Sequence, residues 1–149
     1  MVILMISSYV MIRLLIVKPL ISYDESIKLG EILPVIGVVE LQNLAVTYNE
    51  IYVANKETEK LIRHEAEHDP LTDLLNRGSF NKLIHIYETG ESPFALILVD
   101  VDVFKAVNDT FGHGIGDQIL RKVASVLKKQ FRNIDYVCRI GGDEFAVIM

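Results

Sequence analysis

Residues 136–149 read YVCRIGGDEFAVIM, two apolar stretches separated by a pair of glycines. Glycine adopts backbone conformations with positive φ, and a short glycine-containing connection between two apolar runs is typical of a β-hairpin. We therefore predict two strands, residues 136–140 and 145–149, joined by a tight turn. The acidic residues Asp143 and Glu144 lie at this turn.

The segment before the hairpin alternates between helical and extended patterns. Residues 94–99 (FALILV) form a continuous apolar run, short enough to be a strand buried on both faces. Apolar residues recur at helical spacing in residues 80–87, with Ser79 available as an N-terminal cap, and in residues 115–131. Residues 90–93 are predicted to form a turn. Helix, strand, helix and hairpin make an α/β (α+β) pattern.

The 149-residue chain is acidic, with a formal net charge of −5 and a pI near 5.3. Proteins that bind nucleic-acid polymers carry an excess of Lys and Arg, so no nucleic-acid polymer is expected as a partner. The single cysteine, Cys138, excludes an internal disulfide and a Cys-x-x-Cys metal site. The mean hydropathy of +0.31 is high for a soluble protein.

Much of that hydropathy comes from residues 1–17, MVILMISSYVMIRLLIV, in which Arg13 is the one charged residue. The run has the minimum length for a transmembrane helix, and a buried core helix is the alternative. Arg13 and Lys18 lie at its C-terminal end. The positive-inside rule therefore places the rest of the chain in the cytoplasm, anchored to the inner (cytoplasmic) membrane.

Pro19 follows the apolar run, and an amphipathic helix is predicted to begin near Val39. This helix carries Glu-Leu, Leu-Ala and Tyr-Asn pairs after a connector. In these features residues 18–52 resemble a HAMP signal-relay module. An ordinary amphipathic linker helix is the alternative interpretation.

Residues 53–68 are predicted to form a helical linker that ends at Asp69-Pro70, because proline disfavours the α conformation in the residue before it. A rough seven-residue (heptad) repeat runs into this linker; its positions are Ile51, Asn55, Thr58 and Ile62. Its polar positions predict a weak or switchable coiled coil. His64 and His68 fit the His-Glu-x-x-His pattern of zinc proteases, but a third histidine at the extended spacing is missing. We therefore interpret both histidines as part of a solvated linker face.

Asp100 and Asp102 directly follow the apolar run of the predicted strand. Ligands of open α/β sheets bind beyond the carboxyl ends of strands, and residues two apart in an extended chain share a face. Paired carboxylates suit Mg²⁺, which prefers carboxylate and phosphate oxygens. If this strand neighbours the hairpin, Asp100 and Asp143 converge on one metal site. Acidic residues that only end a strand at the surface are the alternative.

Several motifs occur together and in order over residues 69–149. They are Asp69-Pro-Leu-Thr-Asp-Leu-Leu-Asn-Arg77, Asp100-Val-Asp-Val-Phe-Lys105, Asn108-Asp-Thr-Phe-Gly-His113, Gly116-Asp117 and Gly141-Gly-Asp-Glu-Phe145. Their order and spacing are similar to those of GGDEF diguanylate cyclases, which condense two GTP molecules into cyclic di-GMP and release pyrophosphate. The resemblance implies a ferredoxin-like, polymerase-palm βαββαβ fold, with residues 69–149 as its N-terminal half.

The resemblance also implies roles for individual residues. Asp100, Asp143 and the carbonyl group of Val101 would bind two Mg²⁺ (or Mn²⁺) ions. Asp143 or Glu144 would help to activate the attacking 3′-hydroxyl group. The implied substrate-binding residues are Phe104, Lys105 and Gly142 for the triphosphate, and Asn108 and Asp117 for guanine. Each domain would hold one GTP molecule, so the resemblance implies a homodimer.

Arg132 and Asp135 match the RxxD inhibitory site of the family, at which the arginine and the aspartate bind cyclic di-GMP. A surface charge pair at a helix end is the alternative. A chain that does not catalyse would be a cyclic di-GMP receptor, a membrane relay or an inactive fragment. Family members continue for about half a domain beyond the glycine turn, whereas this sequence stops four residues after Phe145. We therefore expect it to be poorly folded or weakly active.

Overall fold

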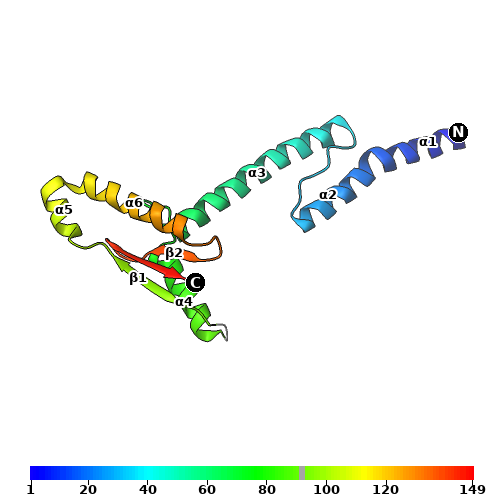
Figure 1. Ribbon diagram of the computed structural model, residues 1–149. Coiled ribbons are helices and arrows are strands. Elements are labelled where there is room, and N and C mark those ends of the chain that lie inside the picture. Colours follow the sequence, from blue (N-terminus) through cyan, green and yellow to red (C-terminus); the bar gives the residue numbers. More distant parts are fainter. Residues whose placement is uncertain (91–92) are drawn as a thin grey trace. The chain divides into compact units, whose positions relative to one another are not determined.

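The computed structural model describes residues 1–90 and 93–149. The chain forms two compact units, Met1–Leu61 and Ile62–Met149 (Figure 1). The turn predicted at residues 90–93 includes residues 91 and 92, which lie outside the described residues.

The first unit begins with a long helical segment made of α1 (Val2–Ile12), a π-helical turn η1 (Arg13–Val17) and α2 (Lys18–Leu29). The helix therefore does not end with the apolar run at residue 17, because the π turn accommodates Pro19. Proline lacks the N–H group that would bond to the carbonyl group four residues earlier, that of Leu15. The N–H group of Lys18 instead bonds to the carbonyl oxygen of Arg13, and the helix continues past the proline.

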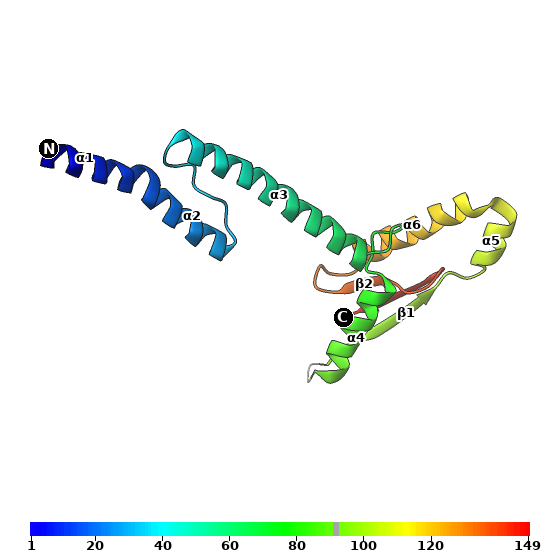
Figure 2. The ribbon, with the colours of Figure 1, turned by 180° about the vertical axis from the view of Figure 1, so that it is seen from behind.

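Helix α3 (Val39–Glu67) starts where the amphipathic pattern predicts and ends before Pro70. Within the first unit, α2 and α3 run in the same direction, with an extended connector between them (Figure 2). Asn49 on α3 holds this connector. Its Oδ1 atom accepts a hydrogen bond of 2.6 Å from the N–H group of Leu33, and its Nδ2 atom donates one of 2.8 Å to the Leu33 carbonyl oxygen. The buried side chains of this unit include Tyr23, Leu33 and Ala45.

Gly37 fixes the point at which the connector meets the proline turn. Its φ angle is +93°, and a Cβ atom there would lie 2.8 Å from the Leu15 carbonyl oxygen and 2.9 Å from the Pro19 ring. The close approach allows the N–H group of Val38 to donate to the Leu15 carbonyl oxygen at 3.3 Å. The acceptor that Pro19 leaves without its usual helical donor is thus satisfied by the connector.

We predict that Gly37→Ala loosens this junction by about 2 kcal/mol, because it adds both backbone strain and a collision. Amide hydrogen exchange in the connector should accelerate by roughly 30-fold. Gly30→Ala is the matched control, since Gly30 also has a positive φ (+66°) but its Cβ position has room. Equal acceleration in the two variants would show that the close packing at Gly37 contributes nothing.

In the second unit, α4 (Arg77–Thr89) follows the loop after α3. Its N-terminal cap is Asn76, whose side chain accepts a hydrogen bond from the Ser79 N–H group at 3.0 Å. The prediction that Ser79 is the cap is therefore wrong. The hydroxyl group of Ser79 instead donates to the Glu67 carbonyl oxygen at 2.8 Å and ties α4 to the end of α3.

The sheet of this unit contains β1 (Leu96–Asp100), β2 (Tyr136–Arg139) and β3 (Glu144–Ile148), in the order β1-β3-β2. Both pairings of β3 are antiparallel. Helices α5 (Phe104–Phe111) and α6 (His113–Gln130) connect β1 to β2 (Figure 1). The arrangement is the split βαββ unit of ferredoxin-like folds, as predicted, although the sequence analysis missed α5.

The core lies between α6 and the central strand β3. It contains the buried residues Leu74, Leu120, Ala124 and Phe145. The prediction that the FALILV strand is buried on both faces is wrong, since Leu98 on β1 is 65% exposed. β1 is an edge strand among the described residues, and β3 takes the buried central position.

An ion pair joins the loop after α3 to the end of β2. Arg139 Nη1 lies 2.9 Å from Asp69 Oδ1, and the side chains of Arg139 and Asp69 are only 12% and 19% exposed. The same carboxyl oxygen accepts hydrogen bonds from the N–H and hydroxyl groups of Thr72. Burial alone would raise the pKa of Asp69, but the bonds from Thr72 and Arg139 outweigh it and lower that pKa.

We predict that Asp69→Asn destabilises the second unit by about 2 kcal/mol at pH 7. Because the pKa of Asp69 is lower in the folded chain, its contribution is complete above the ordinary value of 3.8 and is lost as the pH falls through the lowered value. The difference between wild type and variant should therefore shrink in acid. Urea unfolding at pH 7 and pH 3 measures the difference in the free energy of unfolding between wild type and Asp69→Asn. Asp109→Asn, at an exposed position, is the control. If the difference does not depend on pH, the ionised carboxylate of Asp69 does not stabilise the second unit.

Candidate active site at the glycine turn

The antiparallel pairing of β1 with β3 brings the two acidic segments to one end of the sheet. Asp100 is paired with Glu144 across the two strands. One residue further, the N–H group of Val101 donates a hydrogen bond of 3.2 Å to the carbonyl oxygen of Asp143. The pairing thus places the backbones of Asp100, Val101, Asp143 and Glu144 side by side at this end of the sheet. Asp102 lies in the turn after β1, so the alternation of side chains along the strand does not extend to it.

The glycine turn is closed by hydrogen bonds to the Glu144 carbonyl oxygen, from Ile140 at 2.9 Å and Gly141 at 3.3 Å. A Cβ atom at Gly141 would collide with the Glu144 carboxylate. A Cβ atom at Gly142 would meet none of the described residues within 4 Å, so the backbone is accessible there. Arg139 donates to the Gly142 carbonyl oxygen at 2.7 Å. Sequence reasoning missed this arginine because no local motif marks it.

Helix α5 starts beside the acidic cluster with an uncapped N-terminus. Its first turn follows Val103, which has a φ of +59°, and no side chain among the described residues caps it. Free backbone N–H groups at a helix N-terminus attract anions. Lys105 in this turn is exposed, whereas the Phe104 side chain packs against the core. The Phe104 N–H group donates to the Val101 carbonyl oxygen at 3.3 Å, so neither its ring nor its N–H group faces a ligand.

Asn108 on α5 lies against Gly116 on α6, the residue next to Asp117 in the sequence. A Cβ atom at Gly116 would overlap Asn108 Oδ1 and lie 3.1 Å from the Phe104 ring. Asn108 Oδ1 is buried and has no hydrogen-bond partner in the part of the chain that the structure describes. A buried polar atom without a partner is costly, which makes it a candidate for ligand contact.

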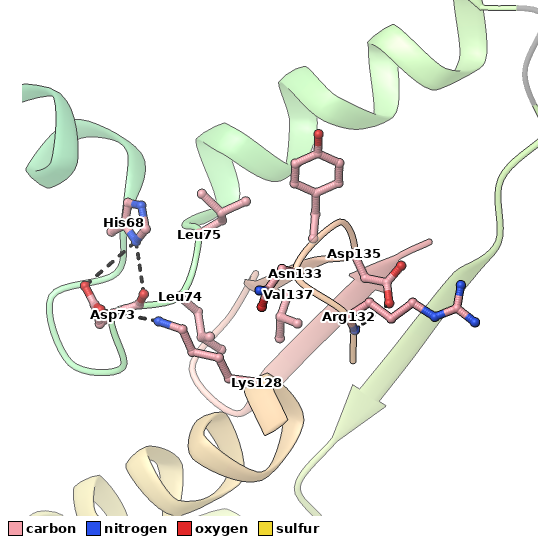
Figure 3. Close-up of a pocket in the computed structure, with 10 residues that line it drawn as sticks. His68, Asp73, Leu74, Leu75, Lys128, Arg132, Asn133, Asp135 and Val137 are labelled. Carbon is pink, nitrogen blue, oxygen red and sulfur yellow. Dashed lines mark hydrogen bonds and ion pairs between the residues drawn. The ribbon is translucent and has the colours of Figure 1, made fainter. Parts of the chain in front are cut away.

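Arg132 and Asp135 lie on the turn between α6 and β2, at the other end of β2 from the glycine pair (Figure 3). Asp135 Oδ2 accepts a hydrogen bond of 2.8 Å from the Arg132 N–H group, and the Asp135 N–H group donates to the Arg132 carbonyl oxygen at 3.0 Å. Both residues line a pocket that His68, Asp73 and Lys128 also border.

The neighbouring Cys138 is buried, which raises the pKa of its thiol to about 11 and keeps it uncharged.

Residues 66–149 match the protein family described as "Diguanylate cyclase, GGDEF domain". The chain is 44% identical over 96 residues to diguanylate cyclase DosC of Escherichia coli K12, covering 61% of this chain and 21% of DosC. It is 47% identical over 85 residues to the response regulator PleD of Caulobacter vibrioides, covering 54% of this chain and 19% of PleD. The chain thus spans about a fifth of the length of each of these relatives.

Solved structures agree with the sequence relatives. The coiled coil and GGDEF domain of DgcB from Caulobacter crescentus, crystallised with c-di-GMP, match with a TM-score of 0.61 at 35% identity, over 72% of this chain and 58% of that chain. Diguanylate cyclase SiaD from Pseudomonas aeruginosa, crystallised with its activator SiaC, matches with a TM-score of 0.55 at 30% identity, over 74% and 44%. Since the family match covers more than half of the chain, the protein belongs to the GGDEF domain family of diguanylate cyclases.

Proposed function

We propose that this chain carries one GTP half-site of a diguanylate cyclase, which condenses two GTP molecules into cyclic di-GMP and pyrophosphate. The observation that carries the proposal is the bond between Val101 and Asp143, next to the paired Asp100 and Glu144. It places Asp100, Asp143 and Glu144 on neighbouring backbone at the end of β1 that leads into α5, whose N-terminus is uncapped. Membership of the GGDEF family supports the same reaction.

The donor set at this end of the sheet fits Mg²⁺ or Mn²⁺, because Asp100, Asp143 and the Val101 carbonyl group all offer hard oxygen atoms. Such ions, when bound, neutralise phosphate charge and activate the attacking 3′-hydroxyl group. Asp143 or Glu144 accepts the proton of that hydroxyl group. The chain's own contribution is to hold these residues at the ends of β1 and β3, whose pairing fixes their backbones.

The triphosphate would lie at the start of α5. The free N–H groups of its first turn and the ammonium group of Lys105 attract phosphate oxygens. Phe104 would support this site by holding the start of α5 in place, through its ring in the core and its bond to the Val101 carbonyl oxygen. Gly142 lets a phosphate approach the glycine turn, because its Cβ position is open among the described residues.

Asn108 and Asp117 would read the guanine base. The unpartnered Asn108 Oδ1 atom supports this assignment, since a guanine edge supplies N–H donors. A carboxylate such as that of Asp117 accepts from guanine N1–H and the 2-amino group together, whereas adenine offers no such pair of donors. GTP is therefore the expected substrate rather than ATP.

Each half-site holds one GTP molecule, so two copies of the domain must face each other in a homodimer. Arg132 and Asp135 would form an inhibitory site for the product, cyclic di-GMP. The exposed turn that presents them supports this assignment, and the DgcB structure shows that a GGDEF relative binds c-di-GMP. A catalytically silent receptor that uses the same two residues is the second candidate function.

The N-terminal unit would anchor and regulate the domain. Among the described residues, one helix, Val2–Leu29, has the length and apolar composition to cross a membrane. We propose residues 1–17 as the transmembrane segment, residues 18–52 as a HAMP-like relay and residues 53–68 as the helical linker to the GGDEF domain at residues 69–149. The parallel course of α2 and α3 supports the relay. The catalytic part would face the cytoplasm from the inner membrane.

We predict that the chain in membranes forms cyclic di-GMP from GTP and Mg²⁺ only at the weak rate expected from its sequence, and that Asp143→Asn lowers this rate about a hundredfold or more, because it removes an ionised oxygen from the reaction centre. Glu88→Gln, an exposed charge removal on α4, is the control and should keep the rate. Equal rates for wild type and Asp143→Asn would exclude the assigned site. Cyclic di-GMP binding without synthesis, lost in Arg132→Ala, would favour the receptor function.

We predict that Gly116→Ala raises the KM for GTP by more than about tenfold, because the new methyl group displaces the Asn108 side chain. Gly114→Ala on the same helix is the matched control, since none of the described residues lies within 4 Å of its Cβ position. That variant should keep the KM and gain up to about 1 kcal/mol of helix stability. Equal KM values for both variants would contradict the guanine-reading role of Asn108.

A further inference from the structure

The last turns of α3 carry His64 and His68 at a spacing of four residues, on one face of the helix. Both histidines were predicted to be part of a solvated linker face. The structure corrects this interpretation, because both contact Asp73 in the loop after α3. His64 Nε2 lies 2.7 Å from Asp73 Oδ1, and His68 Nδ1 lies 3.0 Å from the Asp73 carbonyl oxygen and 3.8 Å from Oδ1.

These three side chains form a compact set of metal-ligating atoms. One nitrogen of each imidazole ring and one Asp73 carboxylate oxygen all lie within 4.8 Å of one another. Ligands at about 2.0–2.2 Å from a zinc ion are roughly 3.3–3.6 Å apart in tetrahedral geometry. The observed separations from Asp73 Oδ1, 2.7 Å and 3.8 Å, lie on either side of this range. To take up an ion, the His64–Asp73 contact has to lengthen and the separation of His68 Nδ1 from Asp73 Oδ1 has to shorten slightly.

The backbone under these ligands is well defined. The two histidines belong to a helix, and the rings stack with their centroids 3.9 Å apart. Asp73 has a φ of +59°, and its N–H group donates to the Asp69 carbonyl oxygen at 2.9 Å. A tight turn thus presents the carboxylate to the helix face. The three side chains line one pocket together with Asp69 and Pro70, so an ion can reach them from solvent.

Lys128 is the neighbouring charge that opposes a cation here, since its Nζ atom lies 3.6 Å from Asp73 Oδ2 (Figure 3). It contacts the carboxylate oxygen that does not face the histidines. The Lys128 side chain is 62% exposed, so it can turn into solvent at little energetic cost. Its presence should weaken ion binding without blocking the site.

We propose that His64, His68 and Asp73 form a binding site for a divalent transition-metal ion of the zinc type. Two imidazole nitrogens with one carboxylate oxygen suit zinc and its neighbours, whereas Mg²⁺ prefers the all-oxygen donors at Asp100 and Asp143. The site is therefore chemically distinct from the reaction centre. A bound ion would cross-link the end of α3 to the loop that leads into α4.

The test is a titration of the purified full-length chain in detergent with Zn²⁺, in excess Mg²⁺, by isothermal titration calorimetry. One zinc ion per chain is expected. His64→Gln and Asp73→Asn should each weaken binding by at least about tenfold, the loss caused even by removing a partner of a metal ligand. Asn tolerates the left-handed backbone at position 73, so Asp73→Asn keeps the turn. His85→Gln, an exposed histidine on α4, should leave the affinity unchanged.

Two further variants separate this site from its surroundings. Lys128→Gln should bind zinc at least as tightly as the wild type, because an opposing charge is removed. Asp143→Asn should keep the zinc affinity, so failure of the proposed cyclase function and failure of this site are distinguishable. Circular dichroism confirms that each variant keeps its helices.

The proposal is overturned if no zinc binds, or if wild type and Asp73→Asn bind it equally. It is also overturned if His85→Gln removes binding while His64→Gln does not. In each of these cases the contacts of Asp73 with the histidines are only hydrogen bonds between α3 and the loop that follows it.

Discussion

The antiparallel pairing of β3 with both of its neighbours is the constraint on which the rest of the second unit depends. It buries Phe145 against α6 and sets Asp100 opposite Glu144. A slip of one residue in this register would turn Phe145 to the other face and separate the acidic residues. The packing of the core and the geometry of the site are therefore fixed by the same hydrogen bonds.

Elements with a strong local pattern were predictable from sequence. The glycine pair predicts the hairpin, and the apolar spacing of residues 115–131 predicts α6. The helix α5 was missed because it has only eight residues, too few to show a clear period. The burial of β1 was overestimated, since an apolar run does not reveal whether a strand occupies the centre or the edge of a sheet.

The acidic residues of the candidate site were predictable from sequence, whereas several of the contacts around them were not. The acidic residues stand in local motifs, so the resemblance of these motifs to those of GGDEF diguanylate cyclases identifies them. Arg139 acts through a contact with Asp69, 70 residues earlier in the sequence, and no motif marks it. Asp73 stands in the motif at residues 69–77, but the motif does not indicate its contacts with His64 and His68. The cap of α4 shows the same limit, because Asn76 and Ser79 are equally suitable by residue type. Only the fold shows that the Ser79 hydroxyl group donates a hydrogen bond to the Glu67 carbonyl oxygen, which leaves Asn76 as the cap.

The contacts around Leu75 connect the end of α3 to the glycine turn. Leu75 forms one backbone bridge with His68 and another, parallel, with Cys138 on β2. Arg139, one residue further, binds both Asp69 and the Gly142 carbonyl oxygen. A shift of the last turn of α3 must therefore break these bonds or move the backbone that carries Asp143. An ion held by His64, His68 and Asp73 would brace this junction, because it would add ligand bonds where the helix now meets the loop.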